Sequence, residues 1–179
     1  MHKSILLFPA LLLVGCGSGA SYKNPEGREL VVSLDKVDLQ DFATTGQAML
    51  QSMLTSPVFD RPGAKPVLAI GRLTNDTGSN FDTDLLLSKL NVPLVNSGRV
   101  VLLAKDPVAE EAQAKVGGVS PKPDFVLSGK ILEDRASAGK TRQSSFVFQL
   151  TLIDVRRGVA AWTEEKIVTK QGTKNAVGF

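Results

Sequence analysis

The chain has few of the residues on which disulfide bonds and many active sites depend. Its 179 residues include one cysteine, Cys16, and one histidine, His2. A lone cysteine excludes an internal disulfide, so packing alone must hold the core. A long apolar run is also missing. The run from Ile5 to Val14 has ten residues, whereas a helix needs about 20 to cross a bilayer.

The short apolar run follows a weakly basic start and is typical of a secretory signal. It ends in Leu13-Val14-Gly15-Cys16, which resembles the bacterial lipobox. The resemblance implies cleavage before Cys16 and acylation of both its thiol and the new amino terminus. The protein would then be anchored to a membrane and would not span it. The resemblance also implies outer-membrane sorting, because Gly17 stands where inner-membrane lipoproteins carry Asp. The alternative is a spare thiol after a simple signal peptide.

Removal of residues 1–15 would also remove His2 and Lys3. The remaining chain carries 20 basic and 18 acidic residues, a net charge of +2. Such a balance predicts no nucleic-acid surface. Without histidine, the mature chain has no Ser-His or Cys-His nucleophile pair and no histidine-based metal site. We therefore expect no metal and no cofactor other than the covalent lipid on Cys16.

Carboxylate pairs are the remaining candidates for acid–base chemistry. Each pair lies among charged or polar residues, where a solvated face is a better interpretation than catalysis. The pairs are Asp82 with Asp84, Glu110 with Glu111, Glu133 with Asp134, and Glu164 with Glu165. We therefore predict that the protein is not an enzyme.

Composition divides the chain into a signal peptide (1–15), a lipidated tether (16–29) and one globular domain (30–179). Residues 17–28 are small and polar and contain Pro25, as in a flexible tether. Residues 30–34 form a short apolar segment that we expect to dock at an edge. The length of the third part suits one domain with its own core.

Hydrophobic periodicity predicts the elements of the domain. Helices are expected at 39–54 after the N-cap Asp38, at about 82–95, and at 107–116. Pro93 should kink or shorten the second helix, and residues 96–98 should end it. Strands are expected at 67–71, 100–104, 125–132, 143–155 and 159–169, with the last two forming a hairpin. Polar loops are expected at 72–80 and 133–142.

The strand, helix and strand between residues 67 and 104 predict a parallel βαβ crossover. The order of elements as a whole predicts an α/β sandwich with helices over a mixed sheet. Ala138-Gly139-Lys140-Thr141 looks like the tail of a phosphate-binding loop, but Asp134 stands where that motif needs its first glycine. A hairpin loop is the better interpretation.

One long segment, LAIGRLTNDTGSNFDTDLLLSKLNVPLVNSGRVVLLA (68–104), resembles the LpoB family. These are outer-membrane lipoproteins that activate a class A penicillin-binding protein, a bifunctional peptidoglycan synthase. The resemblance continues in DFVLSGKI (124–131), in residues 150–154, in Trp162, and in the helix at 39–54. It implies a fold like the amino-terminal domain of TolB, with a four- or five-stranded sheet, and function by docking without chemistry.

The chain departs from the family pattern in its tether, since no long proline-rich segment precedes the domain. At most 21 residues separate Cys16 from the first predicted helix, a reach of at most about 70 Å. An alternative role is an export or assembly lipoprotein resembling CsgG-type components. That role needs membrane-spanning hairpins, and the hairpin at 143–169 carries Glu164, Glu165 and Lys166 in succession. We favour the synthase activator and expect a monomer.

The candidate partner-binding residues lie in the two predicted polar loops. They are Arg72, Asn75, Asp76, Arg135, Lys140 and Arg142. Arginine is frequent at interface hot spots, while asparagine and aspartate also cap helices and hold turns. Ordinary solvated charge is the alternative for each of them.

Overall fold

The computed structural model describes residues 22–25, 27, 32–60, 62–104, 107–118 and 121–173. The chain divides into two units, 1–30 and 31–179, and all helices and strands described belong to the second. In chain order they are α1 (Leu39–Thr55), the 3-10 turn η1 (Pro57–Phe59), β1 (Val67–Asp76), α2 (Thr83–Asn96), β2 (Val101–Leu102), α3 (Pro107–Lys115), β3 (Phe125–Ala138), β4 (Thr141–Asp154) and β5 (Val159–Thr173). The predicted signal peptide and Cys16 lie outside the described residues.

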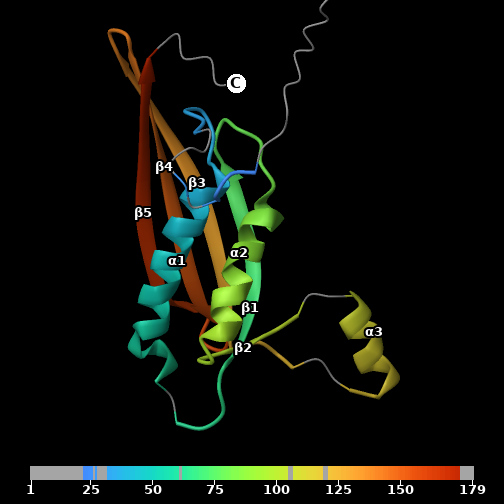
Figure 1. The fold of residues 1–179 in the computed structure, drawn as a ribbon. Coiled ribbons are helices and arrows are strands. Elements are labelled where there is room, and N and C mark those ends of the chain that lie inside the picture. Colours follow the sequence, from blue (N-terminus) through green and yellow to red (C-terminus); the bar gives the residue numbers. More distant parts are fainter. Residues whose placement is uncertain are drawn as a thin grey trace, which may run out of the picture. The chain divides into compact units, whose positions relative to one another are not determined.

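The strands form one sheet in the order β2-β1-β3-β4-β5 (Figure 1). β1 runs parallel to both of its neighbours, β2 and β3. The pairs β3–β4 and β4–β5 are antiparallel. The parallel pairing of β1 and β2 across α2 is the predicted βαβ arrangement. The predicted fold class, helices packed on a mixed sheet, is thus confirmed.

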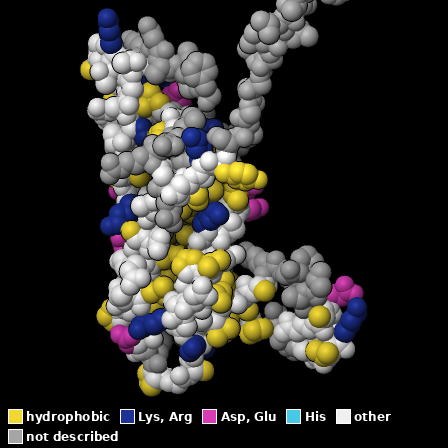
Figure 2. Space-filling model, viewed as in Figure 1, with side chains coloured by type: hydrophobic (Ala, Val, Ile, Leu, Met, Phe, Trp, Pro, Cys, Tyr) yellow, Lys and Arg dark blue, Asp and Glu magenta, His cyan; other side chains and the backbone are white. Residues whose placement is uncertain are grey.

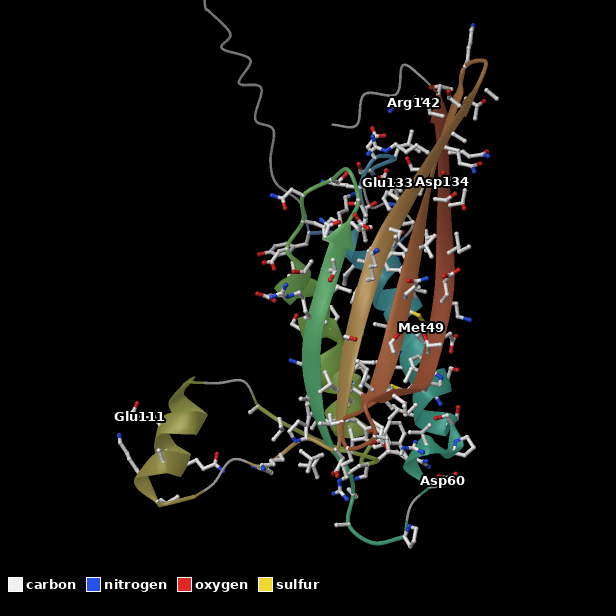
Figure 3. All side chains as sticks on the ribbon, turned by 180° about the vertical axis from the view of Figure 1, so that it is seen from behind. Met49, Asp60, Glu111, Glu133, Asp134 and Arg142 are labelled. Carbon is white, nitrogen blue, oxygen red and sulfur yellow. The ribbon has the colours of Figure 1, made fainter. Side chains whose placement is uncertain are left out.

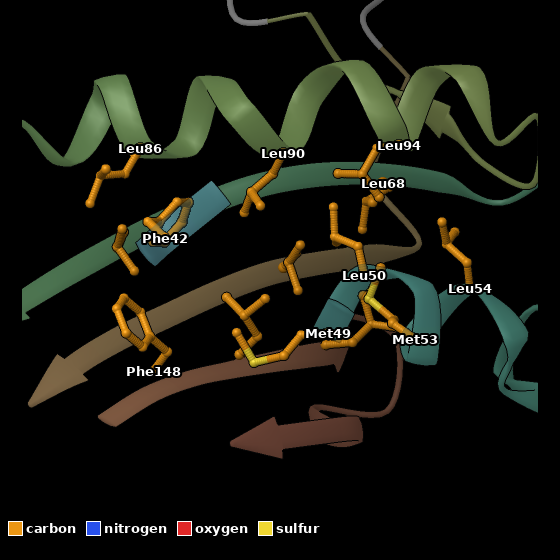
Figure 4. Close-up of a cluster of buried hydrophobic side chains, with 14 of the residues drawn as sticks. Phe42, Met49, Leu50, Met53, Leu54, Leu68, Leu86, Leu90, Leu94 and Phe148 are labelled. Carbon is orange, nitrogen blue, oxygen red and sulfur yellow. The ribbon is translucent and has the colours of Figure 1, made fainter. Parts of the chain in front are cut away.

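Helices α1 and α2 cover one face of the sheet, and the opposite face is seen in Figure 3. Between these two helices and the sheet lies a core of leucine, phenylalanine and methionine side chains (Figure 4). The Phe42 ring of α1 lies 6.0 Å from that of Phe148 on β4, tilted by 59°. On β4, every second residue from Ser144 to Asp154 is buried. The period-two alternation of that strand therefore fixes its inner face.

The sequence of α1 explains its place over the sheet. Its buried residues recur at helical spacing, and Met49 and Met53 are both fully buried. Gly46 faces α2, and a Cβ there would come within 2.9 Å of the Leu90 side chain. The lack of a side chain thus lets the two helices approach closely. α1 ends at Thr55, two residues before Pro57, as predicted.

The first predicted loop is largely wrong, because β1 continues through Arg72 to Asp76. The β1–β3 register shifts by one residue between Ile70 and Leu73. This bulge keeps Leu73 buried at 3% exposure, although polar residues surround it. Pairing with β3 thus extends a strand whose local composition predicts a turn.

The second predicted loop, 133–142, is also wrong. β3 and β4 pair without interruption from Phe125 with Asp154 to Ala138 with Thr141. Only Gly139 and Lys140 form the turn, with Gly139 at φ +57°. Most of the expected loop is therefore an extended two-stranded ribbon, because cross-strand pairing orders polar residues as well as apolar ones.

Three smaller expectations also changed. Pro93 does not shorten α2, which continues to Asn96 and is followed by Gly98 at φ +63°. Pro93 removes one helical hydrogen bond, the one to the carbonyl of residue 89, and only three residues of α2 follow it. The expected strand at 100–104 contracts to the two residues of β2. Leu34 packs on β5 near Gly172, but residues 32–38 form no strand.

Candidate partner-binding surface

Most of the predicted binding residues gather at one end of the sheet. We call this the distal end and define it as residues 75–80 and 132–144. Glu133, Asp134 and Arg142 lie there, whereas Asp60 lies at the opposite end (Figure 3). The carboxyl end of β1 and the β3–β4 ribbon meet at this place because β1 and β3 run parallel and in register from Leu73 to Asp76.

Asn75 holds the turn that follows β1. Its side-chain Nδ2 donates to the Ser79 carbonyl at 2.7 Å. Its Oδ1 accepts from the backbone N–H of Thr77 at 3.2 Å and from the Thr77 hydroxyl at 2.8 Å. This local bonding is the turn function that asparagine commonly serves. The N-cap of α2 is instead Asp82, whose carboxylate accepts from two amides of the first turn.

Glu133 ties the same turn to β3. Its side chain is only 4% exposed, and its Oε2 accepts from the backbone N–H of Gly78 at 2.8 Å. The guanidinium of Arg135 donates to both carboxylate oxygens, at 2.5 and 3.1 Å. This hydrogen bonding raises the pKa of Arg135, against a smaller lowering by burial. A Cβ at position 78 would lie 2.9 Å from the end of the Arg135 side chain, so a larger residue there would displace the guanidinium.

Arg142 pairs with a residue that precedes α1. Its guanidinium lies 3.1 Å from a carboxylate oxygen of Asp35, and the two side chains are 36% and 50% exposed. The Ser79 hydroxyl donates to the Asp35 carbonyl. The segment before α1 is therefore joined both to the β1–α2 loop and to β4.

Lys170 of β5 makes several contacts with the same segment before α1. Its side chain is 7% exposed. Its ammonium lies 2.7 Å from Asp38 and 2.5 Å from Asp41. It also donates to the carbonyls of Ser33 and Lys36, both at 3.0 Å. The same nitrogen sits 5.6 Å from the centre of the Phe146 ring. We call these contacts the Lys170 latch, and they fix residues 33–38 and the start of α1 on β5.

The remaining predicted residues differ in whether an oppositely charged residue pairs with them. Asp76 pairs with Lys130 at 2.9 Å, an exposed pair that contributes little to stability. Lys140 is exposed at the tip of the ribbon. Arg72 is exposed on β1, three residues before Asn75. Neither Arg72 nor Lys140 forms an ion pair with another described residue, so both are free to meet a partner.

Two important residues, one in the distal end and one beside it on β5, were missed from the sequence. Glu133 was noted only as half of a surface carboxylate pair, yet it is buried and central to the turn. Lys170 carried no sequence signal, because its carboxylate partners Asp38 and Asp41 lie 132 and 129 residues away. The face seen in Figure 3 is polar, with hydroxyl pairs Thr151–Thr163 and Ser145–Thr169 across the strands.

Within the described ranges, no group of three metal-binding side chains occurs, and no helix is long and apolar enough to cross a membrane. What the distal end offers is hydrogen bonds and charge of both signs. Such a surface is chemically suited to recognise another protein.

The family model for the peptidoglycan-synthase activator LpoB matches residues 41–168, more than half of the chain. No curated protein sequence matches the chain significantly. The LpoB carboxy-terminal domain from Salmonella enterica is 17% identical, with a TM-score of 0.49, over 72% of this chain and 98% of that one. The same domain from Escherichia coli is 17% identical, with a TM-score of 0.49, over 73% and 99%.

The lipoprotein GNA1162 from Neisseria meningitidis is 15% identical, with a TM-score of 0.40, over 63% of this chain and 86% of that one. These comparisons give the export alternative no support. Because the family model spans α1 and most of the sheet, the chain belongs to the LpoB family of peptidoglycan-synthase activators.

Proposed function

We propose that the protein is a lipid-anchored periplasmic protein that activates a class A, bifunctional peptidoglycan synthase by docking onto it. The observation that carries the proposal is the family match over residues 41–168. The distal end supports docking, because it presents exposed Lys140 at the tip of the ribbon and a turn that Asn75 and Glu133 hold, with exposed Arg72 next to it on β1. A rigid, charged surface loses little entropy on binding.

In this proposal the anchor is the lipid on Cys16, and the Lys170 latch limits how far the domain can extend from the membrane. Residues 33–38 are held on the domain, so at most the sixteen residues 17–32 can act as a spacer. Fully extended, they span at most about 55 Å. The synthase region that binds must therefore come within that distance of the membrane anchor, plus the width of the domain.

Activation is tested by measuring glycan polymerisation by purified bifunctional synthases of the source organism, with and without the domain from Leu30 onward. We expect a higher rate with the domain and with no added cofactor. The charge-removing variants Arg72→Ala and Lys140→Ala should weaken activation without changing thermal stability. If no synthase responds and a deletion strain makes its cell wall normally, the proposed function is wrong.

Anchoring is tested by labelling cells with a fatty-acid probe. The wild-type protein should take up label, and Cys16→Ala should not, because the thiol is the proposed attachment point. The domain of the variant should still fold, since residues 31–179 form a unit apart from residues 1–30. Label that survives the substitution would contradict the lipobox assignment.

A further inference from the structure

The edge of the sheet at β1 is mostly unpaired. β2 pairs only with Val67 and Leu68 of the ten-residue β1. The last bond on this side runs from the Leu103 N–H to the Leu68 carbonyl, at 2.8 Å. Because a strand has a period of two, Ile70 directs its peptide groups to the same side as Leu68. No strand from the described ranges pairs with this edge beyond Leu68, so it is open to an added strand.

A groove of about 570 Å³ runs beside this edge, between α2 and the sheet. Its apolar lining comes from Ile70, Leu87, Val95, Leu102, Leu103 and Ala104. Ser88 and Asn91 add polar groups from α2, and Asp84 lies in the first turn of that helix. The groove therefore combines a strand edge that has no described strand partner beyond Leu68 with an apolar wall.

Helix α2, which forms one side of the groove, carries exposed apolar side chains, and one of them, Val95, lines the groove itself. Val92 and Val95 of α2 are 64% and 56% exposed, and Leu85 and Val101 are each 48% exposed. Figure 2 shows hydrophobic side chains along α2 on this side of the molecule. Exposed apolar side chains beside an apolar groove are typical of a site where another protein binds.

The two edges of the sheet differ in the side chains that lie on or beside them. β5, at the other edge, carries Glu164, Glu165 and Lys166 in succession. Charged residues on an edge strand oppose pairing with another chain. The β1 edge has apolar residues beside it instead, so it is the edge at which strand addition is favoured.

The chemistry of the groove defines its occupant. A strand edge pairs with an extended backbone, and the apolar wall suits apolar side chains at alternate positions of that backbone. Asp84 forms no ion pair with another described residue, which favours a lysine or arginine in the occupant. The edge also leads directly to Asn75 and Asp76 of the distal end.

We infer that an extended segment of the activated synthase adds to the sheet along β1, with alternate apolar side chains in the groove against α2 and a basic residue facing Asp84. This inference rests on the proposed function and names the mode by which the synthase docks. The distal end then contacts the flanks of the same segment, while the edge supplies backbone hydrogen bonds that specify strand conformation.

The test compares two full-length variants in detergent for binding to the purified synthase. Val95→Lys places a charge in the groove, and Ile167→Lys places one on β5 at a residue of similar exposure, 56% against 60%. We expect Val95→Lys to weaken binding at least about ten-fold and Ile167→Lys to leave it within about two-fold. Both variants should melt like the wild type, because both side chains are exposed.

Amide hydrogen exchange of the same complex gives a direct readout. The β1 amides beyond Leu68 that point away from β3 should become protected when the synthase binds, whereas those on the outer edge of β5 should not. If Val95→Lys binds like the wild type and the β1 amides stay unprotected in the complex, the inference is wrong and the proposed function stands. If the wild-type protein binds no synthase, both fail together.

Discussion

The Lys170 latch gives the clearest test of how the segment before α1 is held. Lys170→Met would keep most of the apolar stem but remove the ammonium that lies between Asp38 and Asp41. The two carboxylates, 20% and 19% exposed, would then lie side by side without a cation. Breaking one partner of a buried ionic group costs about 3–5 kcal/mol. Partial exposure of the carboxylates places the expected loss of unfolding free energy near the lower value, about 3 kcal/mol.

For a domain of this size, that loss lowers the melting temperature by roughly 6–12 °C, measured by circular dichroism. The matched control is the triple variant with Asp38→Asn and Asp41→Asn added to Lys170→Met. It has no unpaired charge, and the new side chain at position 38 retains an N-cap function because asparagine caps helices as well as aspartate does. We expect it to recover most of the lost stability. A triple variant as unstable as the single one would show that packing, and not charge, explains the effect.

Three further predictions concern other parts of the domain. Asn75→Ala should lower the unfolding free energy by about 1–2 kcal/mol in urea, because the turn after β1 loses three hydrogen bonds. An unchanged midpoint of urea unfolding would mean that the turn does not depend on the Asn75 side chain. Gly129→Ala should cost about 1–3 kcal/mol, since the new methyl would lie 2.8 Å from two leucine side chains; Ser128→Ala is the control. Burial raises the pKa of Glu164, but hydrogen bonds from Ser52 and Lys166 lower it more, so the net shift is downward. A lowered folded-state pKa gives stability at neutral pH that is lost as the pH falls through that pKa, so Glu164→Gln should flatten the acid limb of the stability curve, and an unaltered limb would contradict this.

The regular elements could be predicted because their signals are local. Helix α1 was expected at 39–54 and begins and ends within one residue of that. The β1–α2–β2 unit was expected because an apolar run, a helical pattern and a second apolar run follow one another. The polar ends of β1, β3 and β4 could not be predicted, because residues 72–76 and 133–142 have the composition of turns. Their partners across the sheet, and not their own propensities, make them strands.

The candidate site was predictable only as a region. Asn75, Asp76, Arg135 and Arg142 were expected to share a surface, and the structure brings them to one end of the sheet. Their roles were harder to foresee, because a sequence shows charge but not pairing. Arg135 and Arg142 are already engaged by Glu133 and Asp35, whereas Arg72 and Lys140 pair with no described residue. Exposure of a cation therefore indicates a binding residue only after its acidic neighbours in the fold are known.

The placement of these contacts bears on how docking and anchoring combine. The Lys170 latch and the Arg142–Asp35 pair both hold the segment that leads from the predicted tether into α1. Both lie on or beside the distal end, so the tether enters the domain close to the proposed docking surface. In the proposed function, a partner bound there would lie within about 55 Å of the anchor, plus the width of the domain. Release of the latch would add residues 33–38 to the spacer, about 20 Å when extended, and would loosen the start of α1. Tight anchoring of the segment therefore favours a partner whose binding region extends toward the outer membrane over one confined to the opposite side of the periplasm.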